Sequence, residues 1–162
     1  MKKSVGIAIW RLVWLPCAAA LALWVLLFAV YYGHAAYQKV QAVRHTSAFL
    51  HELKQEEFRQ AVTHYGEPLD GEGLRLLHER EAFKLADYGH VRAEFDDGCV
   101  CVVHAELTFE TKAKMVETDA IITLRKGKKP GQVCAITPSG VERGEIPELD
   151  AWNRIVCGHD DL

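Results

Sequence analysis

The sequence predicts an α+β fold in which an N-terminal transmembrane helix is followed by a long helix packed on a four-stranded antiparallel meander sheet. Three observations lead to this prediction. Residues 12–32 form an apolar run without a charged residue. Residues 37–65 place apolar side chains at helical spacing, and from about residue 89 the apolar period becomes that of a strand. A helix that covers one face of such a sheet is an α+β layer architecture.

The apolar run is long enough to be a membrane anchor. At about 1.5 Å per residue, a helix over residues 12–32 crosses a hydrocarbon core of about 30 Å. Lys2, Lys3 and Arg11 precede the run, and basic residues stay on the cytoplasmic side of a membrane. We therefore expect a single-pass protein of the cell's inner (plasma) membrane. Its expected parts are a cytoplasmic tail over residues 1–11, a transmembrane helix over 12–32 and an extracytoplasmic α+β domain over 33–162.

A cleaved signal peptide is the alternative interpretation of this run. Signal peptides have a shorter apolar region, of about 7–15 residues, and a cleavage site of small residues. Residues 33–36 could supply such a site, but the length of the run favours a retained anchor. Aromatic and small side chains in the anchor could pack against a neighbouring membrane helix, although lipid contact suits the small ones equally well. The residues expected in this packing are Trp14, Ala18, Ala22 and Trp24.

The extracytoplasmic domain is expected to begin with one continuous helix over residues 37–65. Gly66 followed by Pro68 is a stop signal for this helix. Gly33 is the expected hinge between the helix and the membrane span, and Asp70 is expected to cap a short second helix. The apolar face of the long helix comprises Leu50, Leu53, Phe58, Ala61, Val62 and Tyr65.

The sheet is expected over residues 89–138, followed by a flexible tail over 139–162. We expect a three-residue turn, Asp96-Asp97-Gly98, between the first two strands, with Gly98 left-handed, because this register keeps apolar residues opposite each other. The pairs set by this turn are Phe95 with Cys99 and Ala93 with Cys101. The other expected features are a pairing of Phe109 with Val116 and a fourth strand over residues 133–137.

This order of elements resembles the cystatin-like or nuclear-transport-factor-like group of domains. The likeness covers roughly residues 40–138: a long amphipathic helix with the pair Phe49-Leu50, a short helix and then a curved meander. Several bacterial members of that group hang from one N-terminal membrane helix, including inner-membrane scaffold subunits of secretion machines. The resemblance implies a fold and a class of precedents, and it transfers no functional residue because fold does not imply function.

Four cysteines follow the anchor, and an oxidising compartment makes them disulfide candidates. On a regular strand, Cys99 and Cys101 would have parallel side chains and Cα atoms about 6.5–7 Å apart. A whole strand would separate Cys101 from Cys134. Any disulfide is therefore expected to include Cys157, paired with Cys134 or Cys101, and buried free thiols are the alternative. A metal site with Cys157 or His159 as fourth ligand would lack the Cys-x2-Cys spacing of structural zinc.

The opposite face of the sheet carries polar side chains. His104, Glu106 and Asp119 could bind a divalent ion or serve as acid and base. Asp119 and Glu117 are expected across from Glu106 and Thr108. Alternation of this kind normally indicates a solvated sheet face, which is the alternative interpretation.

The composition excludes some functions and favours others. A formal net charge of −3 gives no footprint for nucleic acid. We find no catalytic constellation and no cofactor pattern, and therefore expect no cofactor, catalytic residue or metal ligand. The expected function is a membrane-anchored assembly or scaffold subunit, acting by protein–protein association or self-association in a cell-envelope complex. The alternative is a small-ligand-binding or metal-binding domain, or an enzyme, that uses a cavity between helix and sheet.

Overall fold

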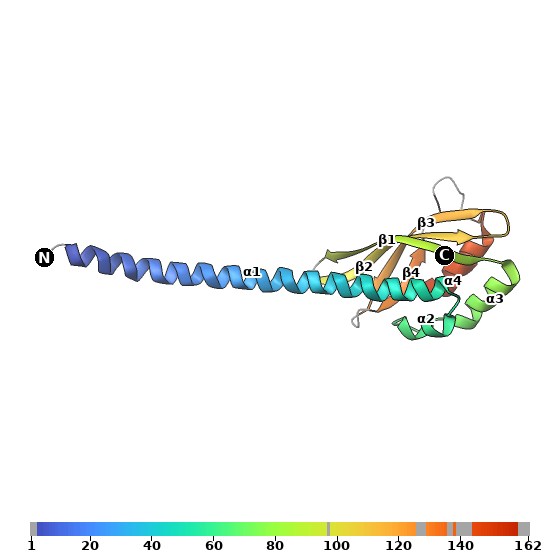
Figure 1. The fold of residues 1–162 in the computed structure, drawn as a ribbon, viewed down its shortest axis with the longest axis horizontal. Coiled ribbons are helices and arrows are strands. Elements are labelled where there is room, and N and C mark those ends of the chain that lie inside the picture. The colour runs from blue at the N-terminus through green and yellow to red at the C-terminus, as the bar shows by residue number, and fades with distance from the viewer. Residues whose placement is uncertain (1–2, 97, 126–128, 136–137, 139–143, 159–162) are drawn as a thin grey trace. The chain divides into compact units, whose positions relative to one another are not determined.

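The computed structural model describes residues 3–96, 98–125, 129–135, 138 and 144–158, with side chains from residue 14 onward except that of residue 96. The chain divides into two compact units, Met1–Tyr37 and Gln38–Leu162. Figure 1 shows the elements in chain order. They are α1 (Lys3–Lys54), α2 (Phe58–His64), α3 (Gly71–Glu81), β1 (Lys84–Asp96), β2 (Cys99–Glu110), β3 (Met115–Leu124), β4 (Pro130–Ala135) and α4 (Pro147–Cys157).

The described part of the first unit is helical and is long and apolar enough to span a membrane. Pro16 lies inside the helix, and the helix also continues through Gly33, where a hinge was expected. One glycine costs a helix about 1 kcal/mol, which is small beside the hydrogen bonds of a helix of this length. Apart from its chain neighbours and the adjacent helix backbone, no described atom lies within 4 Å of the position that a Cβ on Gly33 would occupy.

The prediction of one continuous helix over residues 37–65 was wrong. α1 ends at Lys54 and α2 begins at Phe58. Between them Glu56 adopts a left-handed conformation, with φ of 63°. This break redirects the chain so that α2 buries Ala61, and Tyr65 just after it, in the same core as the last turns of α1. A straight helix could not bring both segments onto one sheet.

The short second helix agrees with its expected cap. The Asp70 side chain accepts a hydrogen bond from the backbone N–H of Gly73, at 2.8 Å, and α3 begins at Gly71. Leu74 is the buried residue of this helix. The aspartate therefore satisfies one of the N–H groups that every helix N-terminus leaves without a partner.

The four strands form one antiparallel sheet in the order β1-β2-β3-β4, which confirms the predicted α+β fold class. Phe109 pairs with Val116, as expected for the second hairpin. β1 begins earlier than predicted, at Lys84, and β4 runs from Pro130 to Ala135. The last two residues of the predicted fourth strand lie outside the described residues.

The predicted register of the first hairpin was wrong. Asp96 pairs with Cys99, which leaves a two-residue turn in which Gly98 is left-handed, with φ of 83°. Ala93 pairs with Val103 and not with Cys101. With regular strands, a two-residue turn would place Glu94 and Arg92 opposite the apolar face of the second strand. A bulge in β2 removes this conflict. Val100 and Cys101 together face one residue of β1, so Val100 turns inward and Cys101 outward.

The C-terminal segment is a helix that completes the core, not the flexible tail that was expected. The Trp152 ring packs edge-on against Phe109, with ring centroids 4.8 Å apart. Leu149, Trp152 and Val156 are all buried. The helix starts with Pro147 and ends with left-handed Gly158, which are typical boundary residues.

α4 also covers one edge of the sheet. The side chain of Gln132 in β4 donates to the Cys157 carbonyl at 2.6 Å. The Asn153 amide donates to the Ala135 carbonyl at 3.5 Å, and the Cys157 thiol contacts the Val133 carbonyl. An edge strand with unpaired backbone groups can pair with another chain. The contacts from Asn153 and Cys157 satisfy two carbonyl groups of β4. β1 forms the other edge of the sheet.

Candidate functional site

The exposed apolar surface of the described chain is concentrated on α1. Its large apolar side chains from Trp14 to Val40 are 49–73% exposed, and outside this run Met115 is the other such side chain in the described part. Contiguous apolar surface of this size marks an interaction with a membrane or a protein. A helix pairs its own backbone N–H and C=O groups, so it can lie in a hydrocarbon core that offers no hydrogen bonds.

The four residues expected to pack in the membrane all lie in this exposed run. Trp24, Phe28 and Tyr32 follow each other at a spacing of four residues, with ring centroids 5.3 Å and 4.2 Å apart. They form an aromatic row along one side of the helix. Contact of Trp14, Ala18, Ala22 or Trp24 with another helix stays a prediction.

The face of the sheet opposite the core is open and polar. Glu106 pairs with Asp119 and Thr108 pairs with Glu117, as the sequence predicted. Carboxylates from three strands border a shallow hollow of about 680 Å³ on this face. Its lining residues are Asp87, Tyr88, Gly89, His90, Glu106, Thr108, Glu117, Thr118, Asp119 and Pro138.

The predicted trio of His104, Glu106 and Asp119 lines one hollow of about 220 Å³ on this face, but its side chains do not converge on a common point. His104 Nε2 lies 3.4 Å from a carboxylate oxygen of Glu94 on β1. Glu106 instead contacts His90, with 2.6 Å between Oε2 and Nδ1. No group of three metal-ligating side chains occurs among the described residues. β1 brings a carboxylate to His104 and an imidazole to Glu106, so these two side chains do not pair with each other.

His90 was missed by the sequence reasoning. It sits in a bulge of β1, between the pairs of Gly89 and Arg92, and has a φ of 49°. The bulge adds a residue to the strand and carries the imidazole to Glu106. A glycine inside a strand often marks a bulge, so Gly89 was the available signal.

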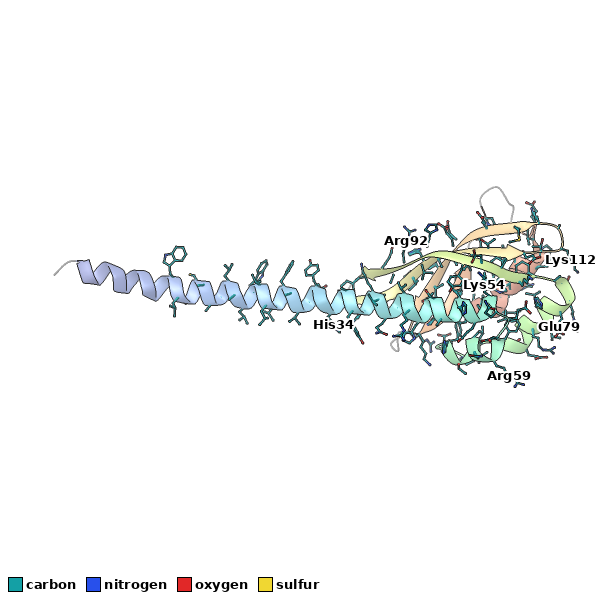
Figure 2. All side chains as sticks on the ribbon, viewed as in Figure 1. His34, Lys54, Arg59, Glu79, Arg92 and Lys112 are labelled. Carbon is teal, nitrogen blue, oxygen red and sulfur yellow. A yellow bond between two sulfur atoms is a disulfide. The ribbon has the colours of Figure 1, made fainter. Side chains whose placement is uncertain are left out.

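An ion pair joins α1 to the rim of the hollow. Lys54 Nζ lies 2.8 Å from Asp87 Oδ1, and Figure 2 labels Lys54 near the end of α1. The hydrogen bond from Lys54, followed by that from the Tyr88 backbone N–H, holds the pKa of Asp87 below its usual value. Asp87 therefore keeps its negative charge at the rim down to a lower pH than an ordinary aspartate.

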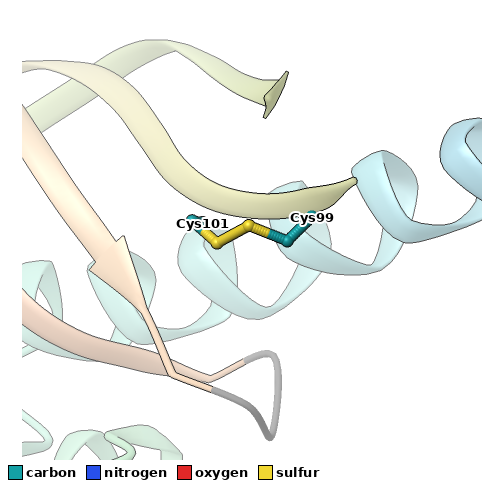
Figure 3. The surroundings of a disulfide bond; sticks show 2 residues. All are labelled: Cys99 and Cys101. Carbon is teal, nitrogen blue, oxygen red and sulfur yellow. A yellow bond between two sulfur atoms is a disulfide. The ribbon is translucent and has the colours of Figure 1, made fainter. Parts of the chain in front are cut away.

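Cys99 and Cys101 form a disulfide, with Cα atoms 5.5 Å apart (Figure 3). The expectation that every disulfide includes Cys157 was therefore wrong, and the pairing of Cys101 with Cys157 is not formed. That expectation assumed a regular strand. The bulge at Val100 and Cys101 shortens the strand and brings the two Cα atoms within disulfide range.

Cys134 and Cys157 are free thiols. Burial, and then the neighbouring thiol of Cys134, raise the pKa of Cys157 to about 12. A disulfide between these two cysteines stays a prediction. The four-cysteine metal arrangement is not formed in the described structure because Cys99 and Cys101 are bonded to each other, and His159 lies outside the described residues.

No family model, curated protein or solved structure matches this chain. The fold and the exposed surface define its class: an α+β domain whose first helix is apolar enough to span a membrane.

Proposed function

We propose that the protein is a single-pass membrane subunit whose α+β domain associates with other proteins, or with its own copies, in a cell-envelope complex. The observation that carries this proposal is the distribution of apolar surface. The domain buries its apolar side chains in one core, whereas the large apolar side chains of α1 from Trp14 to Val40 stay exposed. Such a helix needs lipid or a partner helix around it.

The proposed orientation places the N-terminus in the cytoplasm and the domain outside the inner (plasma) membrane. Lys2, Lys3 and Arg11 precede the apolar run and support this orientation. The Cys99–Cys101 disulfide gives independent support, because disulfides persist in oxidising compartments and are rare in the cytosol.

A role in association also agrees with how the sheet is covered. Helices cover one face, α4 covers the β4 edge, and the face with the polar hollow is left open. The proposed resemblance to cystatin-like or nuclear-transport-factor-like domains supplies precedents for scaffold subunits with one anchor. It supports the proposal without assigning a residue to a role.

The alternative proposal, a ligand or enzyme site between helix and sheet, finds little room. A pocket among the described residues, lined by side chains of the helices and of β1, has a volume of about 10 Å³. That is space for at most about one water molecule. Leu53, Phe83 and Trp152 are among the side chains that fill this region.

The test is the composition of the purified particle. We would purify the tagged full-length protein from membranes in mild detergent and measure its native mass. Stoichiometric protein partners or a defined oligomer is the expected result. The double variant Glu117→Lys with Asp119→Lys tests whether the open sheet face takes part in the association. The double variant Lys112→Glu with Lys114→Glu changes two exposed charges away from that face and is the control. A lone monomer from native membranes, with or without a bound small molecule, would contradict the proposal.

A further inference from the structure

The Cys99–Cys101 disulfide is placed at the accessible end of a hairpin. Both cysteines belong to the first residues of β2, directly after the turn that contains Gly98. Figure 3 shows the bond running along this strand. Cys101 is exposed and Cys99 is half-buried. Of the two sulfur-bearing residues, Cys101 is therefore the more open to an incoming molecule.

This disulfide does not staple the fold. Its two ends lie in one strand, two residues apart in sequence, so it joins no separate elements. Stabilisation by a disulfide grows with the length of the loop that it closes, and this loop is among the shortest that can be closed. The pair that could tie α4 to β4, Cys157 and Cys134, consists of free thiols. A bond that contributes so little to stability is better explained by its chemistry.

The bulge in β2 presents the bond to solvent. In a regular strand Val100 and Cys101 would alternate with Val103, and Cys101 would point to the core face together with Val103. In the structure Val100 and Val103 are both buried and Cys101 points outward. Exposed disulfides exchange with thiols, whereas buried structural ones resist reduction. The backbone thus holds the Cys101 sulfur where a thiolate can approach it.

We infer that the Cys99–Cys101 pair is a thiol–disulfide exchange site whose co-reactant is a dithiol. A thiolate of the dithiol attacks the Cys101 sulfur, and the Cys99–Cys101 bond breaks. Cys99 leaves as a thiolate and takes a proton from water. The second thiolate of the partner then attacks the partner's first sulfur, which is bonded to Cys101 in the mixed disulfide. Cys101 is released as a thiolate and takes a proton from water.

The reaction is balanced in electrons. The partner dithiol loses two electrons and two protons and becomes a disulfide, while Cys99 and Cys101 gain both as two thiols. The reverse reaction transfers the same electrons to a partner disulfide. The inference does not depend on the proposed association, since exchange requires only access to the Cys101 sulfur.

The first experiment measures reduction in the folded full-length protein. The protein carries Cys17→Ser, Cys134→Ser and Cys157→Ser and is held in mild detergent, so that only the pair remains. Dithiothreitol is the model dithiol, and a maleimide mass tag counts the thiols after an acid quench. We expect complete reduction at millimolar dithiothreitol while the circular dichroism of the fold is unchanged. A bond that resists reduction until the protein unfolds would overturn the inference.

The second experiment identifies the sulfur that is attacked. In the same background, Cys99→Ser leaves Cys101 and Cys101→Ser leaves Cys99, and each variant reacts with oxidised glutathione. Because reactivity follows exposure, we expect Cys101 to form the mixed disulfide at least about tenfold faster than Cys99. Equal rates, or a faster reaction at Cys99, would overturn the assignment. Peptide mapping of protein alkylated in intact cells provides a check that needs no variant: finding both cysteines permanently as thiols would refute the site.

Discussion

Tyr65 links the end of α2 to the end of α4. Its hydroxyl donates a hydrogen bond to the Val156 carbonyl at 2.6 Å, and the side chain is buried. The last four carbonyls of a helix lack partners within the helix, so this hydroxyl satisfies one of them. The Tyr65 ring also stacks on Phe49 of α1, with centroids 5.1 Å apart. One residue thus connects three helices in the core.

We predict that Tyr65→Phe lowers the free energy of unfolding by about 1–2 kcal/mol, because it leaves a buried carbonyl without a donor. The measurement is denaturant unfolding of the full chain in micelles. With Trp10, Trp14 and Trp24 replaced by Phe, Trp152 is the only remaining tryptophan and reports on the core. Val62→Ala, on the same helix and half-buried, is the comparison for lost packing alone. An unchanged midpoint for Tyr65→Phe would show that water replaces the hydroxyl.

Cys157 makes the stability of the domain depend on pH. Burial and Cys134 raise its pKa from 9.0 to about 12. In the unfolded chain the thiol loses its proton near its ordinary pKa, while the folded protein keeps it. Above about pH 9 the unfolded state therefore binds fewer protons, and the free energy of unfolding falls as the pH rises.

We predict a loss of about 1–2 kcal/mol between about pH 8 and about pH 10.5 that is due to Cys157. The measurement is the same denaturant titration at the two pH values. Other groups also titrate in this range, so the decisive quantity is the difference between the wild type and Cys157→Ala. The variant should lose less stability over the same interval. Equal losses would mean that the Cys157 thiolate is as well accommodated in the folded protein as in water.

At the scale of the elements, the break between α1 and α2 decides how the helices cover the sheet. Glu56 holds the break in a left-handed conformation that residues other than glycine rarely adopt. A contact of 3.3 Å between Glu56 and His78 links the break to α3. Glu57, the next residue, has an ordinary φ of −81°. The two adjacent glutamates therefore provide a matched pair for substitution.

We predict that Glu56→Gly raises the free energy of unfolding by about 0.5–1 kcal/mol, because glycine adopts this conformation without a steric penalty. Glu57→Gly should lower it by a similar amount, since it adds freedom to the unfolded chain without relieving strain. Both variants are compared by denaturant unfolding with Trp152 as the probe. If both destabilise equally, the left-handed conformation at Glu56 is not present in solution.

Across the whole molecule, the surface of the N-terminal helix is apolar and the surface of the α+β domain is polar. The exposed large apolar side chains of the described residues lie almost entirely on α1, while the domain exposes charged and polar groups. This contrast is what a membrane boundary within the chain requires. The proposed orientation rests on the basic residues before the span.

We predict that an impermeant maleimide applied to intact cells labels Met115→Cys and misses Lys3→Cys, with all native cysteines replaced by serine. Met115 is 55% exposed, so a cysteine there is accessible. Permeabilised cells, in which both positions should react, are the control. Labelling of Lys3→Cys alone would reverse the proposed orientation. Release of the domain by alkaline carbonate, with a new N-terminus near Ala36, would instead favour a signal peptide.

Features that depend on residues close together in the chain could be predicted from their order. The run over residues 12–32 is apolar at every position, so any helix formed there needs an apolar environment. Asp70 caps α3 because its side chain reaches an amide three residues away. The pairing of Phe109 with Val116 follows from a short polar connection between two alternating strands. Each of these outcomes requires only contacts that are local in the chain.

The other features depend on contacts between distant parts of the chain, which outweighed local preference. Nothing in the local sequence stops the helix at Lys54, and packing of the segment around Tyr65 on the core ends it there. The bulge that exposes Cys101 is stable because Val100 is buried by the rest of the core. With that bulge, two cysteines that a regular strand would hold apart come within bonding distance. Burial against distant parts of the chain has no signature in the order of nearby residues, and therefore only the folded domain reveals it.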